Sequence, residues 1–403
     1  MLSGRDIICF ANDWGADPLS KKHVMKRLAQ KNRILWVNSL HNRRPQLAKK
    51  DARRVAQKLR EFFRGVRTAQ PNIWQVTPLY LPFLGSAWVR RLNRSLLRFQ
   101  LRHALRRLRF RDHITWTFSP TSADVVGTLG ESLVIYHCVD EYAAFSDAAR
   151  EIESAEKLLL KKADLVLVSS VPLLEKKRAF NAQTYLALHG VDYEHFRRAV
   201  EDSTPVAPEL LDLPRPILGF HGLLADWVDL ELIAGIARSR PEWSIVLVGR
   251  ADTDITSLQN LPNVHWVGHR PYALLPTYLK GFDVALLPFL CNELTRNANP
   301  LKLREYLAAG LPVVAAPLPE IIRFKGLVSL ASTADEYVSQ VEGILARGRG
   351  GPSSDRSDKM VGESWETKLA EIERLVATAL LTRQKGRQSP IPNVQGSGST
   401  IFR

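Results

Sequence analysis

Lys302 and Glu305, three positions apart in the segment 297–316, are the residues whose types and spacing best suit chemistry. In a helix this spacing places both side chains on one face. A lysine beside the free N–H groups of a helix N-terminus forms a site for a phosphate group. Glu305, one turn deeper, is placed to accept hydrogen bonds from the hydroxyls of a sugar. The alternative is a surface helix with a solvated ion pair, and the spacing alone does not decide between them.

The flanking residues predict the elements that would position this pair. Asn299 can cap the helix, and Pro300 fits its first position. Gly310 is a typical helix end, and residues 313–316 form an apolar run like that of a strand buried on both faces. The segment therefore predicts a loop, a short helix and a buried strand, in that order.

A second candidate is Asp140, in the loop 138–142 that follows the apolar run 133–137. In parallel α/β sheets, ligands bind beyond the carboxyl ends of the strands. A carboxylate there can take a proton from an incoming hydroxyl, so Asp140 is the leading candidate for a general base. Its alternative role is to cap the next helix. Asp13 follows the first strand, at 7–10, in the same way, and its alternative role is to form a turn.

The wider pattern predicts an α/β protein. Strand-like and helix-like segments alternate over the first half and again from residue 217, which indicates parallel sheets. Prolines cluster between 205 and 216 and mark a linker. The expected units are an N-terminal domain over 1–195, a linker over 196–216, a second domain over 217–363, a helix over 364–384 and a disordered tail over 385–403.

Loops after three strands of the second half offer further ligand-binding candidates. A glycine after the strand 217–220 lets the backbone approach a ligand near the start of a helix. The candidates are His221 and Gly222 after that strand, Arg250 after 244–248 and His269 after 264–267.

Composition narrows the partners and the compartment. The 403 residues carry a net charge of +15, which favours an anionic partner. The 3 cysteines are far apart and suggest neither a disulfide framework nor a metal site, so we expect a reducing compartment. Because the sequence has no run of about eighteen apolar residues, we expect no segment that spans a membrane.

Much of the positive charge lies in the segments 43–65 and 88–111. Arginines recur every four residues through the second segment, beside an apolar side, as in a helix that lies in a membrane interface with its arginines on lipid phosphates. One alternative is a domain helix with a solvated basic side. Another is a nucleic-acid-binding helix, but the sequence has no recognisable motif for it, so we expect no nucleic acid partner. The expected membrane or acceptor contacts are Trp88, Arg90, Arg94, Arg98 and Arg102.

Three stretches together resemble the group 1, or family-4-like, glycosyltransferases of the two-domain GT-B fold. Residues 189–196, His-Gly-Val-Asp-Tyr-Glu-His-Phe, resemble the NGVD…F segment that ends their first domain. Residues 268–288 resemble their G…Y…D…P stretch, and residues 299–314 resemble their nucleotide-sugar helix, P-x-K-x-x-E-Y-x-A-x-G-x-P-V-V. The likeness covers most of residues 5–325. It is greatest to bacterial enzymes that build cell-surface polysaccharides, including those of the teichuronic-acid type and a glucuronosyltransferase of xanthan assembly.

The resemblance implies two Rossmann-like domains that face each other across a cleft, with a C-terminal helix crossing back. It implies transfer of a sugar from a nucleotide-sugar, UDP- or GDP-linked, to a hydroxyl of a lipid-linked saccharide, with no further cofactor. By the same resemblance Lys302 binds the donor diphosphate, Glu305 binds the ribose hydroxyls and Asp140 is the base. The expected location is the cytoplasm, at the inner face of the cell membrane, on an anionic lipid surface.

One departure from the family pattern leaves alternatives open. Many retaining relatives carry a glutamate eight residues before the position of Glu305, where this sequence has Asn297. The stereochemical outcome is therefore open. A sugar-nucleotide 2-epimerase of the same fold is one alternative, although it needs neither an acceptor nor a basic helix. A binding protein that has lost turnover is the other, and Asn297 is its support.

Overall fold

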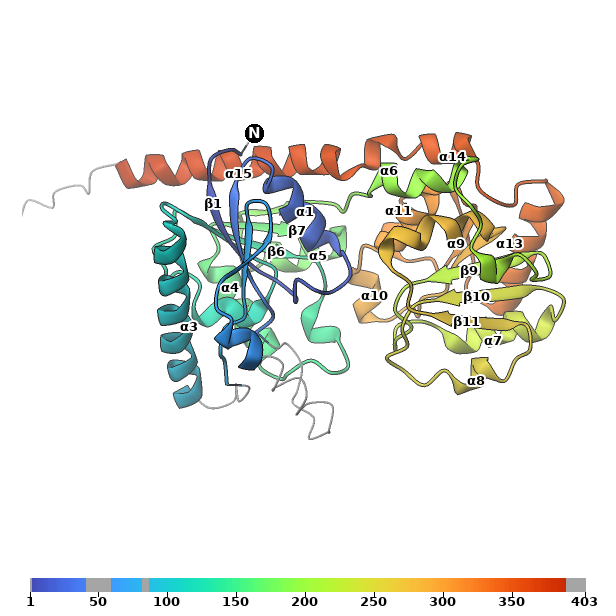
Figure 1. Cartoon of the computed structure of the whole chain (residues 1–403), viewed down its shortest axis with the longest axis horizontal. Coiled ribbons are helices and arrows are strands. Elements are labelled where there is room, and N and C mark those ends of the chain that lie inside the picture. Colours follow the sequence, from blue (N-terminus) through green and yellow to red (C-terminus); the bar gives the residue numbers. More distant parts are fainter. Residues whose placement is uncertain (1, 41–58, 82–86, 389–403) are drawn as a thin grey trace, which may run out of the picture.

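The computed structural model describes residues 2–40, 59–81 and 87–388, which form two α/β domains lying side by side (Figure 1). The first domain has an 8-stranded sheet with the order β3-β4-β2-β1-β5-β6-β7-β8. All its neighbouring strands are parallel except β3, which pairs antiparallel with β4 at one edge. Its strands are β1 (Asp6–Phe10), β2 (Arg33–Val37), β3 (Arg67–Gln70), β4 (Ile73–Val76), β5 (Ile114–Thr117), β6 (Leu133–Cys138), β7 (Leu165–Val168) and β8 (Thr184–Leu186).

The central strands of this sheet are buried on both faces, which explains their unbroken apolar sequences. Every residue of β1, β5, β6 and β7 is buried. Such burial needs helices on both sides of a parallel sheet. The covering helices are α1 (Ser20–Leu28), α3 (Ala87–Leu108), α4 (Ile152–Lys162) and α5 (Val171–Arg178).

The second domain repeats this plan with a 6-stranded parallel sheet in the order β11-β10-β9-β12-β13-β14. In both sheets the order turns around at the first strand, β1 or β9, and such switch points are where α/β sheets bind ligands. Its strands are β9 (Ile217–His221), β10 (Ser244–Val248), β11 (Val264–Gly268), β12 (Val284–Leu287), β13 (Val313–Ala315) and β14 (Val328–Leu330). Its helices are α6 (Tyr193–Phe196), α7 (Leu230–Ser239), α8 (Thr256–Gln259), α9 (Leu275–Gly281), α10 (Glu293–Asn297), α11 (Leu301–Ala308), α12 (Pro319–Ile322), α13 (Ala334–Ala346) and α14 (Ser354–Asp358).

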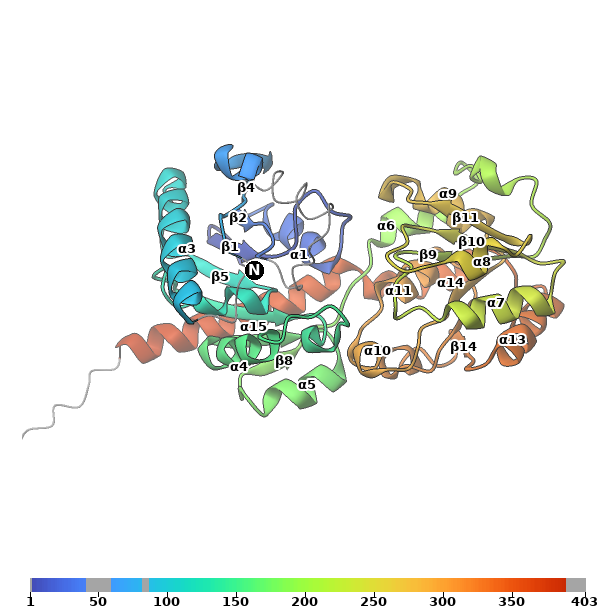
Figure 2. The same cartoon turned by 90° about the horizontal axis from the view of Figure 1, so that it is seen from below.

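The last helix, α15 (Trp365–Gln388), returns from the second domain and runs along the first (Figures 1 and 2). Trp365, Ile372 and Val376 belong to the hydrophobic core of the first domain. The helix crosses back as expected, and it is longer than the predicted helix. The predicted tail is therefore wrong at 385–388, which are helical, and its remainder, 389–403, lies outside the described residues.

The second hydrophobic core begins at Val191 and includes Phe196 and Leu210. The proline-rich segment 196–216 thus packs against the second domain over part of its length. Of the basic segment 43–65, residues 41–58 lie outside the described part of the chain.

We predict that the packing of α15 stabilises the first domain. Ile372 is 1% exposed, so Ile372→Ala should lower the free energy of unfolding of this domain by about 2–5 kcal/mol. Leu381, on the same helix but 60% exposed, is a matched control. Leu381→Ala should change the free energy of unfolding by no more than about 0.5 kcal/mol. Denaturant unfolding of both variants measures the difference. Equal effects would show that α15 does not hold the first domain.

Candidate functional site

Helix α11 presents the predicted Lys302–Glu305 pair, but its N-terminus is built differently from the prediction. Pro300 is the N-cap residue, with no side-chain cap, and the predicted capping role of Asn299 is wrong. The Asn299 side chain instead donates from Nδ2 to the Ser169 carbonyl, 2.6 Å away in the first domain, and accepts from Arg304. A tertiary contact with the other domain has taken the place of the local cap.

Lys302 lies across the backbone of Gly222, the glycine that follows β9. Gly222 has a φ of +132°, and a Cβ atom there would come 1.8 Å from Lys302 Cε. Gly249, after β10, has a φ of +152°, and a Cβ atom there would come 1.8 Å from the Gly222 carbonyl oxygen. Two glycines are therefore needed for the lysine to sit at the ends of these strands. Burial lowers the pKa of Lys302, and the charge of Glu305 opposes this.

Glu305 is held by His221, the last residue of β9. His221 Nε2 lies 3.2 Å from Glu305 Oε2, and both side chains are largely buried. Burial opposes ionisation of Glu305, but the contact with His221 and the charge of Lys302 together act against it, so the pKa of this carboxyl is lowered. Tyr306 fixes His221 in turn, because its hydroxyl accepts from the His221 N–H at 2.8 Å. The predicted donor residues Lys302, Glu305, His221 and Gly222 therefore form one cluster.

Arg250 and His269 do not join this cluster through any described contact, and instead reach across to the first domain. His269 Nε2 lies 3.2 Å from Asp17 Oδ1, and Arg250 Nη2 lies 3.8 Å from Asp17 Oδ2. Asp17 belongs to the loop between β1 and α1. All three side chains are exposed, so this contact is a solvent-facing bridge between the domains.

Asp140 lies two residues after the end of β6, and its carboxylate forms no hydrogen bond or ion pair with any described residue. The short 3₁₀ turn that follows, Tyr142–Ala144, has no side-chain cap, so Asp140 does not take the capping role considered as its alternative. Burial raises the pKa of Asp140 to about 6, against the lowering effect of Lys21. A carboxylate with this pKa is ionised at neutral pH and is still able to accept a proton.

A buried ion network fixes the loop on both sides of Asp140. Lys177 Nζ lies 2.9 Å from Glu141 Oε1 and 2.9 Å from Glu156 Oε2. The Tyr136 hydroxyl donates to Glu156 Oε1 at 2.6 Å. Glu141 is therefore charge-paired and unsuited to act as a base. Sequence reasoning missed Lys177 and Glu156, because the two residues lie on different helices and have no motif spacing.

Asp13 takes the turn role that was its alternative. It is exposed, and its Oδ1 accepts from the Ser39 N–H at 3.0 Å. The neighbouring Trp14 packs edge-on against Trp36, with ring centroids 5.0 Å apart. These contacts connect the loops after β1 and β2, and they leave the Asp13 carboxylate engaged in the loop itself.

Helix α3 is a domain helix whose apolar side packs on its own sheet. Leu97, Leu101 and Leu105 are buried in the first core. The arginine stripe is divided, because Arg90 forms an ion pair with Asp124 at 2.9 Å and Arg102 donates to a backbone carbonyl at 3.1 Å. Those two arginines are therefore structural. Three other predicted contact residues remain exposed, namely Trp88, Arg94 and Arg98.

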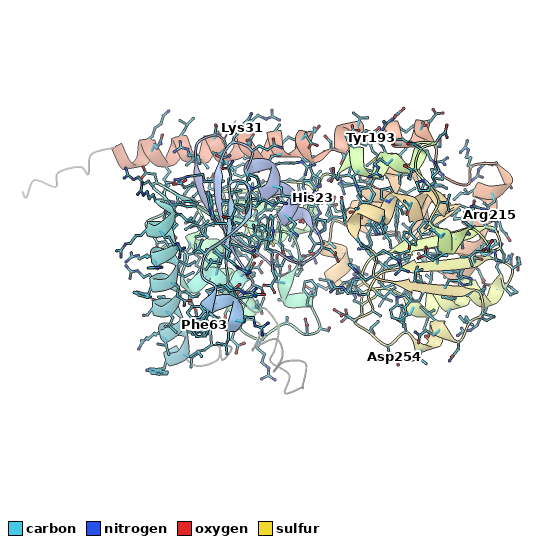
Figure 3. The ribbon with its side chains drawn as sticks, in the orientation of Figure 1. His23, Lys31, Phe63, Tyr193, Arg215 and Asp254 are labelled. Carbon is cyan, nitrogen blue, oxygen red and sulfur yellow. The ribbon has the colours of Figure 1, made fainter. Side chains whose placement is uncertain are left out.

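His23 is a second residue that sequence reasoning missed, and it lies where the two domains meet (Figure 3). Its ring stacks on Trp365 at 5.4 Å, and its Nδ1 is 4.0 Å from Asp192. Burial lowers the pKa of His23 to about 4, so the ring is neutral at pH 7. Within the described residues, no group of His, Cys, Asp and Glu side chains has the arrangement of a metal site.

We predict that Lys177 is essential for the stability of the loop that carries Asp140. Lys177→Met leaves the buried Glu156 carboxylate without its cation and leaves Glu141 with only the more exposed Lys176, so the free energy of unfolding should fall by about 3–5 kcal/mol. The neighbouring Lys176 is a matched control, because it also contacts Glu141 but is 42% exposed. Lys176→Met should cost no more than about 1 kcal/mol. Thermal and denaturant unfolding at pH 7 measure the stability of both variants. Equal losses of stability would contradict the structural role of the buried ion network.

The sequence of the second domain matches a known family. Residues 215–347 match the family described as glycosyl transferases group 1. A Bacillus subtilis protein named for glycosyl transfer in teichuronic acid biosynthesis, TuaH, is 32% identical over 203 residues. That match covers 46% of this chain and 51% of the relative, so the chain matches about half the length of this curated protein.

Solved structures share the arrangement of both domains. Sucrose-phosphate synthase from Thermosynechococcus elongatus superposes with a TM-score of 0.65 at 16% identity, covering 94% of this chain and 100% of that one. HepE of Anabaena, in complex with UDP and glucose, superposes with a TM-score of 0.64 at 13% identity, covering 92% and 99%. At these identities the likeness concerns the fold. Residues 215–347 therefore resemble a group 1 glycosyl transferase domain, and the chain as a whole has the two-domain GT-B fold.

Proposed function

We propose that this protein transfers a sugar from a nucleotide-sugar donor to a hydroxyl of a saccharide acceptor. The observation that carries the proposal is the cluster of Lys302, Glu305 and His221 around Gly222, inside the domain that matches the glycosyl transferases. HepE, which shares the fold, is described in complex with UDP and glucose, and this supports a nucleotide-sugar as the donor.

In the proposed reaction, the donor diphosphate lies at the N-terminus of α11. Lys302 and the free N–H groups of this helix offset the negative charge that develops on the departing diphosphate. Glu305 is kept ionised by His221 and accepts hydrogen bonds from the ribose hydroxyls. The donor is UDP- or GDP-linked, and no further cofactor is part of the proposal.

On the acceptor side, Asp140 is the proposed general base. Its carboxylate is free of partners among the described residues, and its pKa of about 6 suits proton transfer near pH 7. In an inverting transfer, Asp140 takes the proton of the acceptor hydroxyl while that oxygen bonds to the sugar and the diphosphate leaves. Asn297 supports this outcome over a two-glutamate retaining one, because its amide donates to the Glu293 carbonyl at 2.6 Å and offers no carboxylate.

The acceptor in this proposal is a lipid-linked saccharide of surface polysaccharide biosynthesis, reached at the inner face of the cell membrane. The name of TuaH supports the pathway class, and the net charge of +15 supports an anionic surface. No helix in the described part of the chain is both long and apolar enough to cross a bilayer. Association would therefore be peripheral in this proposal.

The outer side of α3 is the proposed membrane contact. Trp88 is 69% exposed and Phe99 is 74% exposed, and about three helical turns separate them on the same side of the helix. Arg94 and Arg98 are exposed beside them. Aromatic side chains at the headgroup level and arginines on lipid phosphates are the usual contacts of an interfacial helix. The predicted contact Trp88 is part of this surface, whereas Leu101 and Leu105 of the same helix face the core.

We predict that Lys302→Ala and Asp140→Asn each lower kcat/KM at least a hundred-fold without lowering the melting temperature. The exposed Lys325, in the same domain as Lys302, is the control, and Lys325→Ala should keep full activity. Release of the nucleotide and the mass of the glycosylated acceptor measure turnover. The protein is also incubated with the donor alone. If the sugar of the donor is not epimerised in the absence of an acceptor, an epimerase is excluded. Full turnover by Lys302→Ala would remove the diphosphate role.

We predict that Trp88→Ser combined with Phe99→Ser weakens binding to vesicles of phosphatidylglycerol at least ten-fold. Binding to vesicles of neutral phosphatidylcholine should be weak for every variant, and binding to the anionic vesicles should fall as salt rises. Leu211, 65% exposed in the second domain, serves as the control through Leu211→Ser. Co-sedimentation measures the bound fraction. Unchanged binding by the double variant would assign the membrane contact to another surface.

A further inference from the structure

Lys21, in the first turn of α1, points its ammonium toward the loop that carries Asp140. Its Nζ lies 5.6 Å from the centroid of the Tyr142 ring, and Tyr142 follows Asp140 by two positions. Lys21 forms no hydrogen bond or ion pair with any of the described residues. A partly buried ammonium whose one described contact is an aromatic ring, with no carboxylate or carbonyl beside it, carries a desolvation cost that folding alone does not explain.

Three other lysines of the described chain, one beside Lys21 in sequence and two in contact with Glu141, all have hydrogen-bond or ion-pair partners, which makes Lys21 different. Lys22 donates to the Ala16 carbonyl at 2.6 Å and lies over the Trp14 ring. Lys176 and Lys177 are paired with carboxylates. Lys21 is therefore a cation that is available to a group in the site.

We propose that Lys21 is a positioning residue for this reaction. Its charge holds the Asp140 carboxylate in the ionised, proton-accepting form. The proposal rests on the function proposed above. Lys21 acts through Asp140. In the transfer step the proton of the acceptor hydroxyl passes to Asp140, the oxygen forms its bond to the sugar, and the sugar–diphosphate bond breaks with its electron pair leaving on the diphosphate.

The electrostatics of the two groups agree with this geometry. Burial lowers the pKa of Lys21, and the negative charge of Asp140 opposes that lowering most strongly. Burial raises the pKa of Asp140, and Lys21 is the group that lowers it again. Removal of the Lys21 charge should therefore raise the pKa of Asp140 further, and less of the base would be ionised at neutral pH.

The other titratable groups around Asp140 contribute little charge at pH 7. Burial raises the pKa of the Cys9 thiol on β1, of the Cys138 thiol on β6 and of the Tyr142 hydroxyl, so these groups are neutral. His137 and His189 lie near Lys21, and burial lowers the pKa of each to about 3, so both rings are neutral as well. Glu141 is paired with Lys177. Lys21 is thus the uncompensated cation that faces Asp140 within the described chain.

The test is the pH dependence of kcat/KM for wild type, Lys21→Met, Lys21→Arg and Lys22→Met. In wild type the activity should rise with pH through a midpoint near 6, as Asp140 loses its proton. In Lys21→Met the midpoint should move up by about one pH unit, so that the loss of activity is larger below pH 7 than above pH 8. Lys21→Arg keeps the charge and should keep the wild-type midpoint, as should the control Lys22→Met.

Each other outcome overturns the proposal. Lower activity of Lys21→Met with an unchanged midpoint would mean that Lys21 is only structural, and a raised KM for the acceptor alone would mean that it binds the acceptor. Lys21→Gln, also neutral, is used if Lys21→Met does not fold. The variant Asp140→Asn separates the role of Lys21 from the proposed general-base role of Asp140. Full activity of Asp140→Asn would overturn the base assignment itself, whereas an inactive Asp140→Asn with an unshifted Lys21→Met would overturn the role of Lys21 alone.

Discussion

The packing of the Lys302 side chain on bare backbone at Gly222 is the constraint on which the candidate site depends. Gly222 in turn lies against Gly249, so the ends of β9 and β10 and the start of α11 form one continuous contact. Because a side chain at either glycine would fill that space, the sequence has little freedom there. The same helix points Arg304 inward, where it is buried and pairs with Glu363 at 3.2 Å. One short helix thus faces the site and also joins the segment that leads into α15.

The two candidate groups for catalysis come from different domains, so their relation depends on how the domains are held together. Helix α15 begins beside the second domain and buries Trp365 in the first core. Direct hydrogen bonds also cross the junction, such as that from the Ser170 hydroxyl to the Asn297 carbonyl at 2.6 Å. The segment 297–299, which leads into the helix that carries Lys302, is therefore tied to the first domain. The exposed bridge from Asp17 to His269 is weaker, because solvent screens it.

The sequence was informative where local pattern decides structure. Apolar runs identified most strands, and the spacing of Lys302 and Glu305 correctly predicted that they share a face with Gly310 ending the helix. Prediction from the sequence failed where a residue distant along the chain determines the contacts of a side chain. Asn299 bonds to the other domain and to the Arg304 side chain, and it does not cap its helix. The arginines of α3 have a regular spacing, but whether Arg90 faces lipid or Asp124 depends on a short 3₁₀ helix that ends 34 residues away. Lys21 and Lys177 gave no signal, because their importance arises only from the loops and carboxylates that the fold brings to them.

The central claim is that the α11 cluster binds a nucleotide-sugar, and a thermal-shift screen of the purified protein against UDP-, GDP- and dTDP-sugars tests it most directly. A ligand at about one hundred times its dissociation constant adds about 2.7 kcal/mol, which raises the melting temperature by a few degrees. We predict such a shift with a UDP- or GDP-sugar, and we predict that it disappears in Lys302→Ala. A folded protein that shows no shift with any nucleotide-sugar, or a shift that persists in Lys302→Ala, would contradict it.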